Sequence, residues 1–225
     1  MGDIKAVIFD MDGVITDTEK LLVKYWCQAA KEQGFPMTYE HALTLRSLAA
    51  RYAEPYLIEQ FGEGFSYREV RRRRIELMEE DIAQNGVPIK PGVSELMCYL
   101  KEKGYKTAVA TATDIDRASA YLHKAEVYEY FDVLCCGPQV EHGKPEPDIY
   151  LYAAQKLGME PNRCLAVEDS PNGITSAYKA GMRVVMVPDL TQPDGELEKL
   201  IYRKCDGLLG IIGVLEQSST DFKQN

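Results

Sequence analysis

The chain has 225 residues and a formal net charge of −9, which argues against a general nucleic-acid binder because such proteins need a basic face. No apolar run approaches the length of a membrane helix, and the first residues lack the basic and apolar regions of a secretory signal. We therefore expect a cytoplasmic protein that binds neither nucleic acid nor membrane, with one large domain or one domain carrying an insert.

The chain begins with an apolar run of strand type, residues 4–9, and a long stretch without strands follows it. Apolar residues at helical spacing, with stops at glycines, predict helices over residues 18–33, 39–46, 51–61 and 67–84. Residues 16–87 are therefore predicted to be a small helical insert of bundle type.

Beyond Pro88 strands and helices alternate. Near-continuous apolar strands over residues 106–110, 132–136, 164–167 and 183–187 are typical of a parallel sheet that is buried on both faces. The predicted fold class is α/β, a doubly wound parallel sheet with a Rossmann-like core formed by residues 1–15 and 88–216. Residues 217–225 are predicted to be a disordered tail.

The six cysteines and three histidines show no spacing typical of a metal site or a serine triad. The one basic run, residues 71–74, falls in a predicted helix where Glu69 and Glu76 stand four residues from arginines. We interpret this run as a solvated helix face.

Two carboxylates, Asp10 and Asp12, follow the first predicted strand and precede Gly13. On an extended backbone the two side chains share one side, so their charges repel unless a cation lies between them. A surface turn is the commoner origin of such a sequence. A calcium loop does not fit, because Val14 and Leu21 stand where it needs oxygen ligands.

Polar groups also follow three later strands: Thr111 and Thr113, then Lys144, then Glu168 with Asp169. Ligands of parallel α/β sheets bind at the carboxyl ends of the strands. Each group has an ordinary alternative, as a helix-entry hydroxyl, a surface lysine or a helix cap. Because four strand ends carry such groups, convergence on one functional site explains them better than chance.

This combination suits phosphoryl transfer. A carboxylate that attacks a phosphate needs a cation to reduce the repulsion, a lysine to hold the phosphate oxygens and a hydroxyl to fix the geometry. Hard oxygen ligands beside a phosphate favour Mg²⁺ over zinc. We therefore expect magnesium as the cofactor.

Four stretches, residues 10–17, 110–113, 143–145 and 167–173, resemble the four motifs of the haloacid dehalogenase superfamily in order and spacing. The resemblance spans nearly the whole chain. It implies Asp10 as the nucleophile that forms an aspartyl phosphate and Asp12 as the general acid and base. Thr111, the Ala112 amide and Lys144 would hold the phosphoryl group.

The same resemblance implies a metal site and a cap. Asp10, the Asp12 carbonyl and Asp169 would bind magnesium, with Glu168 in support. The helical insert resembles the superfamily's cap of the first type, which closes over the active site. Members of the superfamily that cleave carbon–halogen bonds lack the second aspartate, so Asp12 implies a phosphatase or a phosphomutase.

Residues 13–18 and 143–148 look like the β-phosphoglucomutase-like group. That mutase carries a histidine one turn after the threonine that matches Thr18, whereas this chain has Leu22. It also uses an arginine after a glycine-containing turn, for which Arg46 and Arg51 are the candidates here. Thr18, Arg46 and Arg51 are therefore possible substrate or cap contacts.

We expect a phosphatase that acts on a small phosphorylated metabolite, with sugar phosphates as the favoured class, and a monomer or weak dimer. β-Phosphoglucomutase activity is the alternative. A phosphoacceptor signalling domain, or a non-catalytic binding domain, is the alternative from another class.

Overall fold

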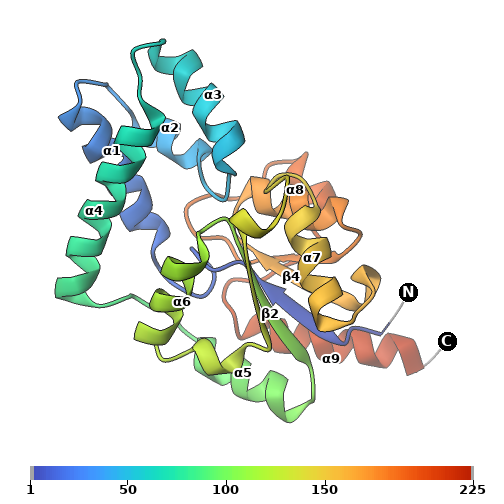
Figure 1. The fold of residues 1–225 in the computed structure, drawn as a ribbon. Helices are drawn as coiled ribbons and strands as arrows, with labels where there is room; N and C mark the ends of the chain where they lie inside the picture. The colour runs from blue at the N-terminus through green and yellow to red at the C-terminus, as the bar shows by residue number, and fades with distance from the viewer. Residues whose placement is uncertain (1–2, 224–225) are drawn as a thin grey trace.

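The computed structural model describes residues 3–223 (Figure 1). Six strands form one sheet in the order β3-β2-β1-β4-β5-β6, and all five neighbouring pairs are parallel. The strands are β1 (Ala6–Phe9), β2 (Lys106–Thr111), β3 (Val133–Cys136), β4 (Cys164–Glu168), β5 (Arg183–Met186) and β6 (Arg203–Lys204). This confirms the predicted α/β class, with β6 as a short edge strand that the sequence analysis did not predict.

Helices cover both faces of the sheet because alternate residues of the apolar strands point to opposite sides. In β1, Val7 and Phe9 pack in the same core as α5 (Val93–Glu102), α6 (Ile115–Lys124) and α9 (Gly210–Lys223). Ala6 and Ile8 pack in a second core with α7 (Asp148–Leu157) and α8 (Pro171–Lys179). Short 3-10 turns at Tyr128–Tyr130, Gly137–Gln139, Pro161–Arg163 and Leu197–Leu200 complete the connections.

Residues between β1 and α5 form four helices that lie together at one end of the molecule (Figure 1). They are α1 (Glu19–Glu32), α2 (Tyr39–Thr44), α3 (Ala50–Phe61) and α4 (Tyr67–Asn85). Trp26 of α1 stacks on Tyr67 of α4 with ring centroids 5.7 Å apart, which joins the two longest helices of this group. We call residues 16–87 the helical insert.

The end of the chain differs from the predicted disordered tail. Helix α9 continues through Lys223, so residues 217–223 are helical, while residues 224 and 225 lie outside the described part of the chain. The apolar face that carries Ile211, Val214 and Leu215 is buried against the core, which holds this helix in place. Among residues 3–223, no helix is both long and apolar enough to cross a bilayer.

Candidate active site

The parallel register brings the predicted strand ends to one level. Phe9 of β1 lies opposite Val109 of β2 and Val167 of β4, so the carboxyl ends of these three strands lie side by side, within two residues of one level. Asp10 is fixed there by its backbone N–H, which donates to the Val167 carbonyl at 2.9 Å. Asp10, Thr111 and Glu168 are all buried at this edge.

Asp10 lies between two hydrogen-bond donors. The Lys144 ammonium donates to Asp10 Oδ1 at 2.7 Å, and the Ser47 hydroxyl donates to Oδ2 at 3.1 Å. Burial raises the pKa of Asp10 to about 7, with the Lys144 charge opposing the rise and the Glu168 charge adding to it. A further positive charge at this edge would therefore favour the ionised carboxylate.

Asp12 is held differently, by hydroxyl groups. Thr18 Oγ1 donates to Asp12 Oδ1, and Thr113 Oγ1 donates to Oδ2 at 3.0 Å. Thr18 is fully buried and also lies 2.8 Å from the Thr16 hydroxyl. The structure thus places Thr18 against Asp12, where it positions the carboxylate, and a contact of Thr18 with substrate stays a prediction.

Lys144 connects two carboxylates. Its ammonium lies 2.7 Å from Asp10 Oδ1 and 2.6 Å from Glu168 Oε1, and the side chain is 1% exposed. Burial by itself lowers the pKa of Lys144, but the charges of Asp10 and Glu168 outweigh it and raise the pKa above its usual value. Lys144 is therefore a fixed positive charge beside Asp10.

Glu168 is immobilised by donors on both oxygens. Besides Lys144, the Tyr150 hydroxyl donates to Oε1 at 2.6 Å, and the Ser170 hydroxyl donates to Oε2 at 3.2 Å. The helix that follows must leave room for this carboxylate: a Cβ at Gly173 would lie 1.9 Å from Glu168 Oε1. Gly173 explains how α8 passes so close to β4.

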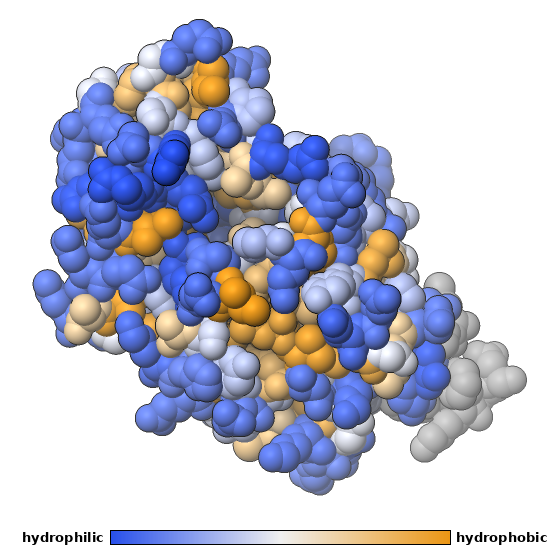
Figure 2. Space-filling view, in the orientation of Figure 1, coloured by the Kyte–Doolittle hydropathy of each residue, from blue (hydrophilic) through white to orange (hydrophobic). Residues whose placement is uncertain are grey.

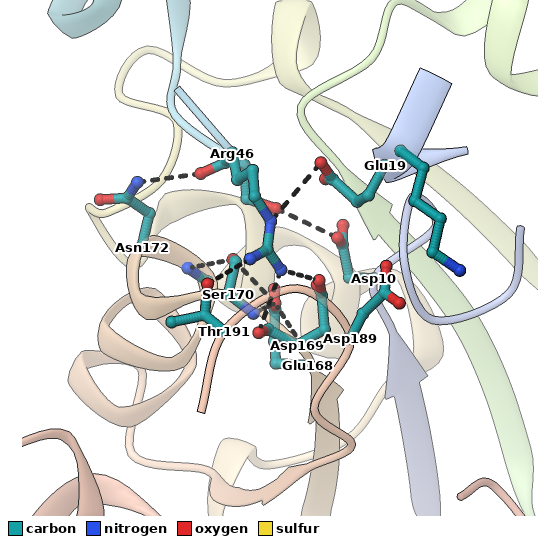
Figure 3. Close-up of polar contacts among 12 residues, drawn as sticks. Asp10, Glu19, Arg46, Glu168, Asp169, Ser170, Asn172, Asp189 and Thr191 are labelled. Atoms are coloured by element: carbon teal, nitrogen blue, oxygen red, sulfur yellow. Dashed lines mark hydrogen bonds and ion pairs between the residues drawn. The ribbon is translucent and has the colours of Figure 1, made fainter. Parts of the chain in front are cut away.

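Asp169 shares a buried ionic cluster with Arg46 from the helical insert (Figure 3). The Arg46 guanidinium donates to Asp169 Oδ2 and, at 3.2 Å, to the Asp169 carbonyl, while Arg46 Nε lies 3.5 Å from Glu19 Oε2. Burial raises the pKa of both Asp169 and Glu19 well above the usual value for a carboxyl, and Arg46 opposes it. Arg46 thus neutralises two buried acids, and its contact with a substrate stays a prediction.

The donor set fits magnesium. Carboxylate oxygens of Asp10, Glu168 and Asp169 lie within 4.8 Å of one another, and Asp169 Oδ1 is buried with no hydrogen-bond partner among residues 3–223. Three hard oxygen donors and an orphaned buried carboxylate oxygen are what a hard cation would satisfy. Asp12 does not belong to this side-chain group.

The other predicted residues are placed as follows. Thr111 is buried, and its hydroxyl accepts the Thr113 backbone N–H at 3.1 Å; Ala112 lies between them. Arg51 donates to the Glu141 carbonyl at 3.0 Å. Within the described residues, no hydrogen bond or ion pair joins Arg51 to Asp10 or Asp12.

Two residues of this site were not predicted from the sequence. Ser47, which donates to Asp10, has a φ of 52°, in the left-handed region that favours glycine, and no glycine marks the turn. Glu19 is 1% exposed, and it could have been found because it shares one helix face with Leu22, Val23 and Trp26.

A pocket opens between the helical insert and the strand ends, and Figure 2 shows a recess there with hydrophilic residues on its sides. Asp10, Asp12, Thr111 and Ala112 line it from the core. The insert contributes Leu22 and Arg46, together with side chains from α3 and α4. A small molecule in this pocket would meet both aspartates.

The chain is similar to known proteins over most of its length. The family model of the haloacid dehalogenase-like hydrolases matches residues 4–181. The phosphorylated carbohydrates phosphatase of Thermotoga maritima is 34% identical over 184 residues, which cover 80% of this chain and 82% of that protein.

Two solved structures have a similar fold. CbbY from Rhodobacter sphaeroides, in complex with phosphate, has a TM-score of 0.74 and 26% identity, covering 91% of this chain and 94% of that one. β-Phosphoglucomutase from Clostridium difficile has a TM-score of 0.82 at 23% identity, covering 99% of this chain and 100% of that one.

Proposed function

The chain belongs to the haloacid dehalogenase-like hydrolases, as its motifs predicted, and from this premise we propose that it is a magnesium-dependent phosphatase of small phosphorylated metabolites. Sugar phosphates are the favoured class, in line with the name of the T. maritima relative. The observation that best supports the proposal is the Lys144 ammonium 2.7 Å from Asp10, beside a second aspartate that accepts from the Thr18 and Thr113 hydroxyls.

Asp10 is the proposed nucleophile. An Asp10 oxygen attacks phosphorus while the bond between phosphorus and the ester oxygen breaks, and Asp12 gives its proton to the departing oxygen. Water then attacks the aspartyl phosphate with Asp12 as base, which releases inorganic phosphate and restores Asp10. Both carboxylates line the pocket, so both can reach a bound ester.

The surrounding residues bind and orient the phosphoryl group. Lys144 supplies a fixed positive charge, while the Thr111 hydroxyl and the Ala112 N–H supply neutral donors at the end of β2. Asp10 and Asp169, with Glu168 in support, would hold magnesium, which supplies positive charge to phosphate oxygens when bound. The helical insert, residues 16–87, acts as the cap that excludes water.

Mutase activity is the second candidate, because a β-phosphoglucomutase shares the fold. A mutase must protect its aspartyl phosphate from water while a sugar intermediate turns round. Leu22 lines the pocket on the cap side and offers no polar group to hold such an intermediate. This favours hydrolysis over return of the phosphoryl group.

Phosphate release from p-nitrophenyl phosphate and from a panel of sugar phosphates tests the proposal. We expect turnover that is lost with chelator, restored by magnesium and poorly supported by calcium. Asp10→Asn should abolish it with the fold intact, and Asp12→Asn should lower it by about 10² to 10⁴.

Two results would contradict the proposal. Full activity of Asp10→Asn would remove the nucleophile from the mechanism. Conversion of β-glucose 1-phosphate to glucose 6-phosphate without phosphate release, given a catalytic amount of the bisphosphate, would establish the mutase.

A further inference from the structure

Two arginines are buried in the pocket, and their surroundings differ. Arg46 is paired with Asp169 and Glu19, as described above. Arg74 of α4 is 5% exposed, yet within residues 3–223 no carboxylate forms an ion pair with it. Its guanidinium lies 5.2 Å from the Trp26 ring and contacts Met78 Sδ at 3.9 Å, and its Nε has no acceptor.

This environment leaves a positive charge uncompensated. A buried charge is costly unless it is paired, and a contact with an aromatic ring or a thioether offsets only a small part of that cost. Burial and, next, the charges of Arg117 and Arg71 lower the pKa of Arg74 to about 9. Even so the guanidinium of Arg74 remains cationic at neutral pH. Packing alone therefore does not explain why a charged side chain is buried here.

The neighbouring arginines of the same helix show that the burial is specific. Arg72 pairs with Glu69 and Glu76 on the exposed face, and Arg73 pairs with Glu32. The prediction of a solvated helix face for residues 71–74 therefore fits Arg72 and Arg73, but it is wrong for the buried Arg74. Arg74 and Arg71 lie on the other side, along the pocket.

Arg74 belongs to the same pocket as Asp10 and Asp12. Arg71 also lines this pocket from α4, and Arg117 lines it from α6 of the core. Arg117 pairs with Asp114, at the start of its own helix, at 2.9 Å. Besides Arg46, three guanidinium groups from the insert and the core thus line the pocket that the two aspartates also line.

We propose that Arg74, with Arg71 and Arg117, binds a second anionic group of the substrate, a phosphate or a carboxylate, while Asp10 attacks the phosphate at the other end. This inference rests on the proposed function and names its substrate class: phosphate esters with an acidic group remote from the ester. Guanidinium groups suit both anions because their N–H fork matches two oxygens. An anion there would also bridge the cap and the core.

The test compares kcat/KM for three sugar substrates: glucose 6-phosphate, 6-phosphogluconate and fructose 1,6-bisphosphate. The wild type should favour the two substrates with a second anionic group, and the ratio between these two identifies which anion the site prefers. Arg74→Leu should lower the preference over glucose 6-phosphate about 10- to 100-fold, the range of one lost charged hydrogen bond. Arg74→Lys keeps the positive charge, so this variant should retain part of the preference for substrates with a second anionic group.

Arg72→Leu is the matched control, because it removes the same charge from the exposed face of α4. Its preference should equal that of the wild type. Should Arg74→Leu fail to fold by circular dichroism, Arg117→Gln replaces it with the same expected direction. Calorimetric titration of Asp10→Asn with fructose 1,6-bisphosphate, with and without the Arg74 substitution, measures binding without turnover.

Failure of the inference and failure of the proposed function give different results. Hydrolysis of p-nitrophenyl phosphate with no preference for a second anion, and no change of binding on substitution of Arg74, overturns the anion site alone. No hydrolysis of any phosphate ester with magnesium, in folded wild-type protein, overturns the proposed function and this inference with it.

Discussion

At the scale of single residues, Gly173 is the position where one added carbon should do most harm. A Cβ there would overlap Glu168 Oε1, the oxygen that also accepts from Lys144 and Tyr150. Gly173→Ala must displace the carboxylate or α8, so we expect a loss of about 1–3 kcal/mol in unfolding free energy and a fall in phosphatase activity.

Gly213 supplies the control, because it is also in a helix but an added Cβ meets no atom. Gly213→Ala should stabilise the fold by roughly 0.5–1 kcal/mol. Urea unfolding of both variants measures the difference. Equal effects of the two substitutions would show that Glu168 is not fixed as described.

Arg46 permits a prediction about the ionic cluster. Arg46→Met leaves Glu19 and Asp169 buried without their cation, and breaking a buried pair in this way costs about 3–5 kcal/mol. Magnesium should raise the Tm of this variant more than that of the wild type, because the guanidinium no longer repels a cation at Asp169.

Thermal unfolding with and without magnesium measures this. Arg72→Met is the control, since its ion pairs are on the exposed face. A magnesium shift of equal size in Arg46→Met and the wild type would mean that Arg46 and the metal do not share Asp169.

Some of the site could be predicted from residue order, and some could not. Asp10, Lys144 and Glu168 each follow an apolar strand, and a parallel sheet must bring such residues to one edge. Ser47 adopts a left-handed φ, and no glycine in the sequence indicates it. Arg74 belongs to a run of four arginines whose composition predicts a solvated helix face, yet its side chain is buried. Both depend on how the insert packs, which local sequence does not encode.

At the scale of elements, α9 shows the limit of reading a polar C-terminal segment as disordered. Ile211, Val214 and Leu215 are buried, and each apolar side chain of this size contributes about 1.5–3 kcal/mol. Deleting residues 210–225 should therefore remove most of a typical total stability of about 5–15 kcal/mol and leave an insoluble or unfolded chain. Deleting only residues 219–225 keeps those three side chains and should leave the fold intact.

Soluble yield and urea unfolding of the two truncations test this. A stable, active chain without residues 210–225 would mean that α9 contributes little to the core. The strands of the sheet were easier to predict than this helix, because β1, β2 and β4 contain short, near-continuous apolar runs, which are typical of parallel strands buried on both faces.

At the scale of the whole molecule, the insert meets the core through the loop between α2 and α3. The Ala49 N–H donates to the Lys144 carbonyl at 3.0 Å. The Asn172 amide donates to the Thr44 carbonyl at 3.3 Å and to the Arg46 carbonyl at 2.9 Å, and Figure 3 shows the bond to Arg46. The loop that carries Arg46 and Ser47 is thus attached to the segment after β4. In the described part of the chain no hydrogen bond joins Asn172 to Asp10 or Asp12, so we expect it to act through the position of this loop.

Asn172→Ala should therefore loosen the helical insert without changing Asp10 or Asp12. Loss of its hydrogen bonds is worth roughly 1–2 kcal/mol, so we expect kcat/KM for p-nitrophenyl phosphate to fall about 5- to 30-fold. Amide hydrogen exchange at Ala49 should become faster, because its bond to Lys144 depends on the same loop.

Asn162→Ala, at an exposed position, is the control and should change neither kcat/KM nor the exchange rate at Ala49. A fall in kcat/KM with unchanged exchange at Ala49 would assign Asn172 a role in the site itself, whereas faster exchange with unchanged kcat/KM would show that catalysis does not require this attachment.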